Sequence, residues 1–176
     1  MVPAHEPMPC RASPSHDVPM SRHILLLTDF SADSERAFAP VVELADLLGA
    51  RVTLLHVVET AAVRPVGAAV ATAMPVAVQY ERDEDAKRRL DDLASRFPRN
   101  CEVATALLRG PDTASEAVAW AGEHGVDMIA MASHGRSGLR RFVMGSVAES
   151  VLRRSRMPVL VFPQPRAVEL AAHQGS

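Results

Sequence analysis

Apolar residues in this chain gather in short uninterrupted runs, separated by longer segments in which they recur every three or four positions. Short apolar runs without alternation are typical of strands buried on both faces of a parallel sheet, and the longer segments predict amphipathic helices that cover it. The most charged helix is expected over Tyr80–Phe97. The regular alternation of strand and helix predicts one α/β domain with right-handed crossovers. The strands are expected at His23–Thr28, Arg51–Val58, Glu102–Leu108, Val126–Ala130 and Pro158–Phe162.

Start and stop signals delimit the helices. Ser31 is expected to cap the first helix and Gly49 to end it, and Pro40 is expected to kink it or to leave a carbonyl unpaired. Thr113 with Glu116 has the spacing of a capping box at the start of a later helix. Within the charged helix, the i,i+4 spacing predicts two ion pairs. These pairs are Glu84–Arg88 and Asp85–Arg89.

The segment between the fourth strand and the last helix, ASHGRSGLRRFVMGS over residues 132–146, is rich in glycine. Such a loop can bring backbone N–H groups close to an anion, and the N-terminus of the following helix adds partial positive charge. Ser146 with Glu149 has the spacing of another capping box. The pattern also fits a tight, well-capped turn that binds nothing. Three glycines together with Arg136 in one loop favour a phosphate site.

This loop resembles the signature of the universal stress proteins, whose ATP-binding branch carries G-x2-G-x9-G-[S/T]. Gly135, Gly145 and Ser146 match the pattern, and Ala132 stands where the first glycine is expected. Its methyl group lies where the backbone is expected to run beside the ribose and phosphates, and it is unfavourable if the position needs a positive φ. The resemblance extends over about residues 21–163. It implies a Rossmann-like three-layer sandwich of the adenine nucleotide alpha hydrolase-like type, with five parallel strands in the order 3-2-1-4-5.

The same resemblance places a nucleotide site between the first and fourth strands, where the strand order reverses. Asp29 is expected at the adenosine end, and the Val57 backbone is expected to read the adenine edge. His134 has no carboxylate or serine spaced to orient it, so no catalytic residue is expected. The residues that the resemblance assigns to the nucleotide are Thr28, Asp29, Val57, Met131, Ala132, His134, Gly135, Arg136, Gly145, Ser146 and Val147.

Composition narrows the function classes. The 176 residues are 48% hydrophobic, enough for one well-packed domain, and a net charge of -2 gives no electrostatic basis for binding nucleic acid or an anionic membrane. No apolar run approaches the roughly 20 residues that span a bilayer. Lys87 is the one lysine, and no G-K-[S/T] follows a glycine loop, which excludes a P-loop ATPase. Cys10 and Cys101 give neither a disulfide framework nor a metal cluster and are expected to be reduced thiols of a cytoplasmic protein.

Three segments are expected: a proline-rich disordered tail over residues 1–21, the universal stress protein domain over 22–163, and a flexible tail over 164–176. The resemblance implies an ATP-binding stress-response regulator without robust turnover, and leaves open whether Mg²⁺ accompanies the ATP. Two alternatives remain: a dimeric family member that binds no nucleotide, and a weak ATPase that uses His134 and Arg136. The apolar strand Val159–Phe162 is expected at the sheet edge, where it would join two chains into a homodimer.

Overall fold

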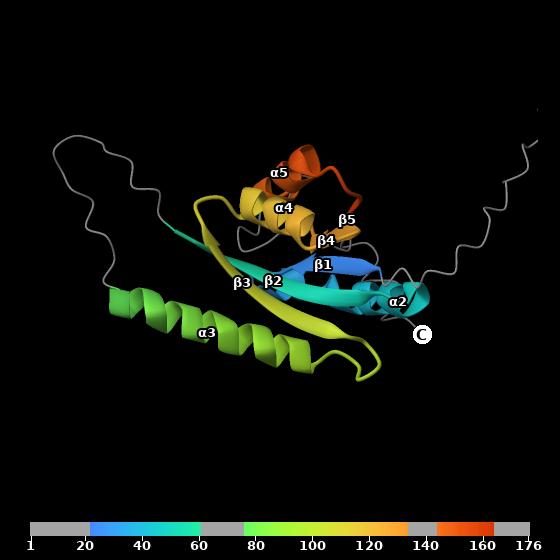
Figure 1. Cartoon of the computed structure of the whole chain (residues 1–176), viewed down its shortest axis with the longest axis horizontal. Coiled ribbons are helices and arrows are strands. Elements are labelled where there is room, and N and C mark those ends of the chain that lie inside the picture. The colour runs from blue at the N-terminus through green and yellow to red at the C-terminus, as the bar shows by residue number, and fades with distance from the viewer. Residues whose placement is uncertain (1–21, 61–75, 134–143, 164–176) are drawn as a thin grey trace, which may run out of the picture.

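The structure, a computed structural model, describes residues 22–60, 76–133 and 144–163. One sheet runs through the centre of the domain, in the order β3-β2-β1-β4-β5 (Figure 1). All of its neighbouring strands are parallel. The predicted α/β class and strand order are therefore confirmed. The strands are β1 (His23–Leu27), β2 (Arg51–Glu59), β3 (Val103–Gly110), β4 (Met128–Ala132) and β5 (Val159–Phe162).

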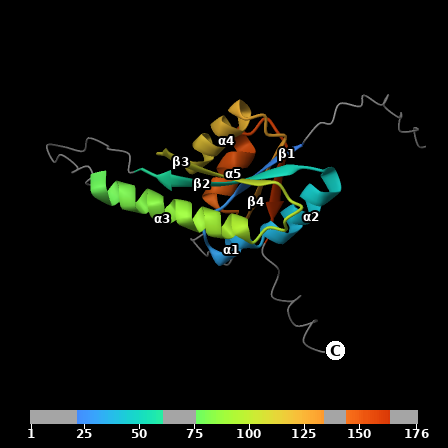
Figure 2. The same ribbon diagram turned by 60° about the horizontal axis from the view of Figure 1, so that its bottom comes forward.

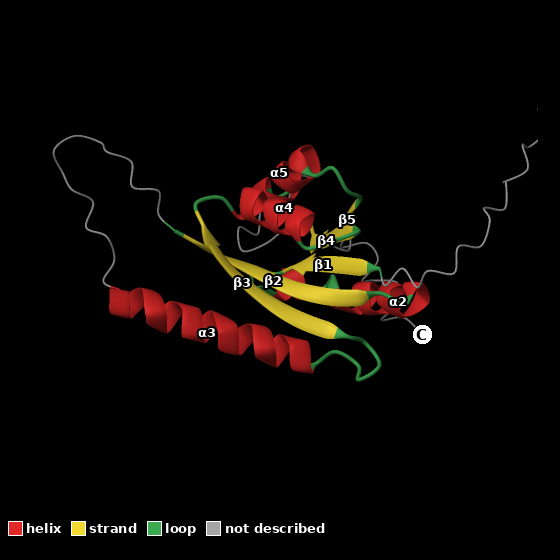
Figure 3. Cartoon of the chain, in the orientation of Figure 1, coloured by secondary structure: helices red, strands yellow, loops and turns green. Residues whose placement is uncertain are grey.

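Helices cover both faces of the sheet and complete a three-layer sandwich (Figures 2 and 3). Every residue of β1 is buried, and its side chains alternate between two cores. Leu25 and Leu27 pack toward α4 and α5, whereas Ile24 and Leu26 pack toward α2 and α3. Burial on both faces explains why this strand is an unbroken apolar run. The helices are α1 (Ala32–Glu35), α2 (Phe38–Leu48), α3 (Val76–Ser95), α4 (Thr113–Glu123) and α5 (Ser146–Arg154).

The first predicted helix is two helices in the structure. Ser31 caps α1 as expected, because its side chain accepts a hydrogen bond from the Ser34 N–H. The helix is interrupted between α1 and α2. Pro40 therefore lies in the first turn of α2, where its missing N–H is not needed. A proline ring clashes with the carbonyl four residues earlier, here that of Arg36, which lies at the break. Gly49 ends α2 in the left-handed conformation, as predicted.

Both predicted capping boxes are wrong. The N-caps are Asp112 for α4 and Gly145 for α5, one residue earlier than expected, and neither helix has a side-chain capping hydrogen bond. Thr113 instead donates its hydroxyl hydrogen bond to Glu59, 2.8 Å away. Ser146 is the first residue of α5 and is exposed, so its hydroxyl is past the position from which a cap can bond back.

The fourth strand also begins later than the sequence predicted. Val126 is buried, but its N–H bonds to the Ala121 carbonyl and completes the turn that follows α4. Gly125 provides the positive φ that this turn requires. The strand then runs Met128–Ala132, so Met131 and Ala132 belong to the sheet. Their position at its carboxyl edge brings them to the site described next.

Candidate functional site

A cavity of about 710 Å³ lies beyond the carboxyl ends of β1, β2 and β4. Its walls come from the β1–α1 connection, one face of α3, the end of β4 and the start of α5. Because β1 pairs with β2 on one side and β4 on the other, this is the point where the strand order reverses. Ligands of open α/β sheets bind at such switch points.

The sequence-predicted site residues that the structure describes all line this cavity. They come from four different elements or connections, and the fold brings them together. The predicted residues His134, Gly135 and Arg136 lie outside the described part of the chain and stay predictions. The residues placed around the cavity are Thr28, Asp29, Val57, Met131, Ala132, Gly145, Ser146 and Val147.

Thr28 fixes the turn that leaves β1. Its N–H donates to the Leu55 carbonyl at 2.9 Å, the last bond of the β1–β2 ladder. Its buried hydroxyl lies 3.1 Å from that of Ser34 and accepts a hydrogen bond from the Phe30 N–H at 3.1 Å. Thr28 therefore shapes the cavity wall through its hydroxyl, which is engaged with the protein itself.

Asp29 follows at the cavity edge and is half-buried. Its Oδ1 accepts hydrogen bonds from the Ser31 N–H at 3.0 Å and the Ser31 hydroxyl at 2.6 Å. This local turn holds the carboxylate in place before any ligand arrives. A pre-positioned carboxylate is a good acceptor for the hydroxyl groups of a sugar.

Phe30 is a site residue that the sequence analysis missed. Its φ is +64°, the left-handed region that a bulky side chain rarely occupies. The Phe30 ring centroid lies 4.2 Å from that of His56, and the Arg89 guanidinium carbon lies 4.5 Å from the Phe30 ring centroid. The His56 Nδ1–H donates to the Thr28 carbonyl at 2.8 Å, which fixes the orientation of the imidazole ring. No local signal predicts this conformation, because phenylalanine is not a turn residue.

Strand β2 continues beyond the end of β1, and its last residues border the cavity. The ladder between the two strands ends at the pair Leu27 and Leu55. The Leu55 carbonyl points toward β1, and backbone groups two residues apart along a strand point the same way. The N–H and C=O of Val57 therefore point to the side that β1 has left, into the cavity. Such a pair can read the edge of a planar heterocycle.

The opposite end of the cavity is formed by the start of α5. The Gly145 N–H is already engaged, since it donates to the Ser133 carbonyl at 2.8 Å. The first-turn N–H groups that follow, from Ser146 to Ala148, belong to residues that line the cavity, and the N-cap side adds no side-chain bond to them. Together with the helix dipole they attract an anion.

Comparison with known proteins gives consistent matches. The model of the Universal stress protein family matches residues 20–163. Universal stress protein MJ0577 of Methanocaldococcus jannaschii is 30% identical over 154 residues, which are 81% of this chain and 94% of that protein. The solved structure of MJ0577 aligns with a TM-score of 0.68 at 28% identity, covering 84% of this chain and 99% of the other.

Two further structures of similar fold were solved with nucleotides. The universal stress protein of Archaeoglobus fulgidus in complex with dAMP aligns with a TM-score of 0.56 at 23% identity, covering 80% of this chain and 96% of the other. A universal stress protein in complex with cAMP aligns with a TM-score of 0.54 at 20% identity, covering 82% and 98%. At these identities the likeness establishes the fold.

No helix in the described ranges is long and apolar enough to cross a membrane.

Proposed function

This chain belongs to the universal stress protein family, and on that premise we propose that it is a stress-response regulator that binds an adenine nucleotide, ATP in the first instance, in the cavity at the carboxyl edge of the sheet. Two members of the fold bind adenine nucleotides, dAMP in one and cAMP in the other. The observation that carries the proposal is the convergence of the predicted residues on one cavity at the switch in strand order.

Each part of the nucleotide has a matching wall in the proposed arrangement. The adenine edge lies against the backbone of Val57, and the ribose hydroxyls donate to Asp29. The phosphates approach the N-terminus of α5 at Ser146 and Val147, where a Mg²⁺ ion could accompany them. In the proposed arrangement the polar groups of this cavity bind and orient the ligand, and turnover is not part of the proposal.

Ala132 favours a second candidate, a family member that acts as a dimer and binds no nucleotide. The position of Ala132 in the structure makes it weaker evidence against nucleotide binding. Ala132 closes β4, and Phe30 is the non-glycine residue with positive φ in the described chain. Alanine therefore carries no backbone strain here, and its methyl group acts only through the space it occupies in the cavity.

The proposal extends to assembly and compartment: a cytoplasmic homodimer joined through β5. That strand is at the sheet edge, and Val159, Leu160, Val161 and Phe162 are all half-buried in the single chain. An open apolar edge is a template for pairing with another strand. A second copy offering β5 antiparallel across a two-fold axis would satisfy the edge and bury these side chains.

Calorimetric titration of the full chain with ATP, AMP and GTP tests the proposed function. Adenine nucleotides are expected to bind and GTP to bind more weakly, because the Val57 backbone is set to recognise one base edge. An Ala132→Gly variant is expected to bind ATP as well as the parent or better, since the substitution removes a methyl group from the cavity. Folded protein that takes up no nucleotide at millimolar concentration would rule out the proposal and favour the dimeric, non-binding member.

A further inference from the structure

The α3 wall of the cavity carries two arginines that the proposed ATP site does not use. Arg82, Asp85, Ala86 and Arg89 line the cavity at spacings of three and four residues, so one face of the helix points into it. Ala86 is buried and small, which leaves room between the arginines. Arg82 and Arg89 are two turns apart, about 10.5 Å along the helix axis.

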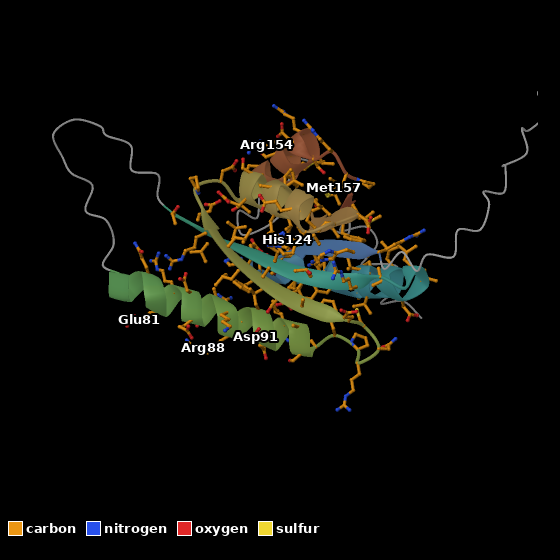
Figure 4. The ribbon with its side chains drawn as sticks, viewed as in Figure 1. Glu81, Arg88, Asp91, His124, Arg154 and Met157 are labelled. Atoms are coloured by element: carbon orange, nitrogen blue, oxygen red, sulfur yellow. The ribbon has the colours of Figure 1, made fainter. Side chains whose placement is uncertain are left out.

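Arg89 lies four residues after Asp85, a spacing that favours an ion pair, but the two side chains form none in the structure. The expected pairs Asp85–Arg89 and Glu84–Arg88 are not among the ion pairs of the described residues. Asp85 instead contacts Arg88 at 3.5 Å, and Figure 4 shows Arg88 on the side of α3 that faces away from the sheet. Arg89 lies over the Phe30 ring. The prediction from spacing is wrong here because the aromatic ring competes for the guanidinium.

Within the described ranges, neither Arg82 nor Arg89 forms an ion pair, although arginines elsewhere on the domain do. The acidic side chains of the cavity have other partners: Asp29 with Ser31, Glu59 with Thr113, and Asp85 with Arg88. Two guanidinium groups that face a cavity and form no ion pair with a described residue keep their hydrogen-bond donors available for an anionic ligand.

These arginines belong to a different wall of the cavity from the start of α5. Helix α3 covers one face of the sheet, and α4 and α5 cover the other (Figures 1 and 2). Arg89 is anchored over Phe30, the residue that follows Asp29, and therefore lies at the adenosine end. An anion bound at the N-terminus of α5 and an anion bound at α3 would therefore contact different walls of the cavity.

We infer that the cavity accepts an adenine nucleotide with a second phosphate on a ribose hydroxyl, bound by Arg89 and Arg82, in addition to the 5′-phosphate at α5. The inference rests on the proposed function and names its ligand class more closely. Asp29 takes the ribose hydroxyl that remains free, and the planar guanidinium of Arg89 takes the phosphate beside it through paired hydrogen bonds. An arginine near the ribose is a recurrent solution for binding a ribose phosphate.

Isothermal titration of the full chain with AMP, with adenosine 2′,5′- and 3′,5′-bisphosphate, and with ATP tests the inference. The parent is expected to bind one bisphosphate at least about tenfold more tightly than AMP, the gain typical of charge-assisted hydrogen bonds. Arg89→Met and Arg82→Met should reduce that preference while AMP affinity stays within about twofold, since methionine keeps the apolar stem over the ring. Circular dichroism and the melting temperature establish that each variant is folded.

Lys87→Met is the matched control. Lys87 is exposed on the same helix, does not line the cavity, and loses the same charge, so it reports the long-range electrostatic effect alone. Arg89→Lys keeps the charge without the planar fork and should restore only part of the preference.

Three results overturn the inference and leave the proposed function intact. The first is a parent that binds AMP and ATP but shows no preference for either bisphosphate. The second is a loss in the arginine variants that grows from AMP to ATP, which assigns the arginines to the 5′-phosphate chain. The third is an equal loss for every ligand, adenosine included, which means that Arg89 only supports Phe30. A folded parent that binds none of these nucleotides overturns the proposed function and this inference together.

Discussion

Two glycines allow ligand binding and folding stability to be perturbed separately. Gly145 lines the cavity with φ −59° and ψ 147°, an extended conformation that any residue adopts. In a Gly145→Val variant, the less suitable N-cap residue costs roughly 0.5–1 kcal/mol. The loss of glycine's freedom in the unfolded chain returns about 0.4–1 kcal/mol. The free energy of unfolding should therefore change by less than about 0.5 kcal/mol.

Gly49 gives the opposite result. It lies at the amino edge of the sheet, φ is +59°, and a Cβ placed there has no atom within 4 Å. The cost of Gly49→Ala is therefore conformational alone, about 1–2 kcal/mol for an L-residue in the left-handed region. A domain of this size loses roughly 2–4 °C in melting temperature for each kcal/mol. Nucleotide binding at the other edge of the sheet should not change.

Thermal unfolding with and without ATP measures both effects. At a hundredfold excess over Kd, ATP stabilises the folded state by about 2.7 kcal/mol, which corresponds to a rise of roughly 5–10 °C. The parent and Gly49→Ala should both show this rise, from different baselines. Gly145→Val should begin at the parent's baseline and show little rise, because the valine side chain occupies the approach to the N-terminus of α5. A full rise in Gly145→Val would refute this placement of the phosphates.

Two further predictions concern assembly and pH. Light scattering should find the parent dimeric at micromolar concentration and Val161→Lys monomeric or aggregated; a parent that is already monomeric would contradict the proposed β5 interface. Burial and the nearby Arg51 guanidinium lower the pKa of His23, an effect that Asp127 partly opposes. Because the unfolded chain then binds the proton more tightly, the free energy of unfolding should fall as the pH drops below about 6.5. Urea titrations should show a weaker fall in His23→Gln, and identical pH profiles would refute the role of His23.

The sequence predicted the β-sheet better than the helix ends, for a physical reason. A strand buried on both faces must be apolar throughout, so β1 and β2 are visible as runs of hydrophobic residues. A capping box depends on one side-chain rotamer at one position. Ser146 has the right spacing to Glu149, yet the helix begins one residue earlier than that box requires. Tertiary context can override such a local signal, so the spacing of two residues does not by itself fix the first residue of a helix.

The residues of the candidate site also fall into those that the sequence predicts and those that it does not. Asp29 lies two residues after β1 and Gly145 lies directly before α5, so a rule about strand ends in parallel sheets is enough to bring them together. Arg89 is on a helix whose charged residues have the spacing of a solvated, self-paired surface. Its role at the cavity depends on Phe30, whose left-handed backbone turns the ring toward α3. That conformation is a property of the folded chain and has no signature in the order of residues.

The difference between backbone groups near α5 and side chains on α3 bears on how the cavity could distinguish one adenine nucleotide from another. The motif that identifies the family lies in the sequence before α5, where the proposed phosphate contacts come from backbone groups, which do not distinguish what the rest of the ligand carries. Side chains that distinguish one adenine nucleotide from another must therefore lie on a different wall. In this chain Arg82 and Arg89 of α3 line the described part of the cavity and form no ion pair with another described residue. The ligand of this protein is consequently better identified by varying the substituents on the ribose than by varying the length of the phosphate chain.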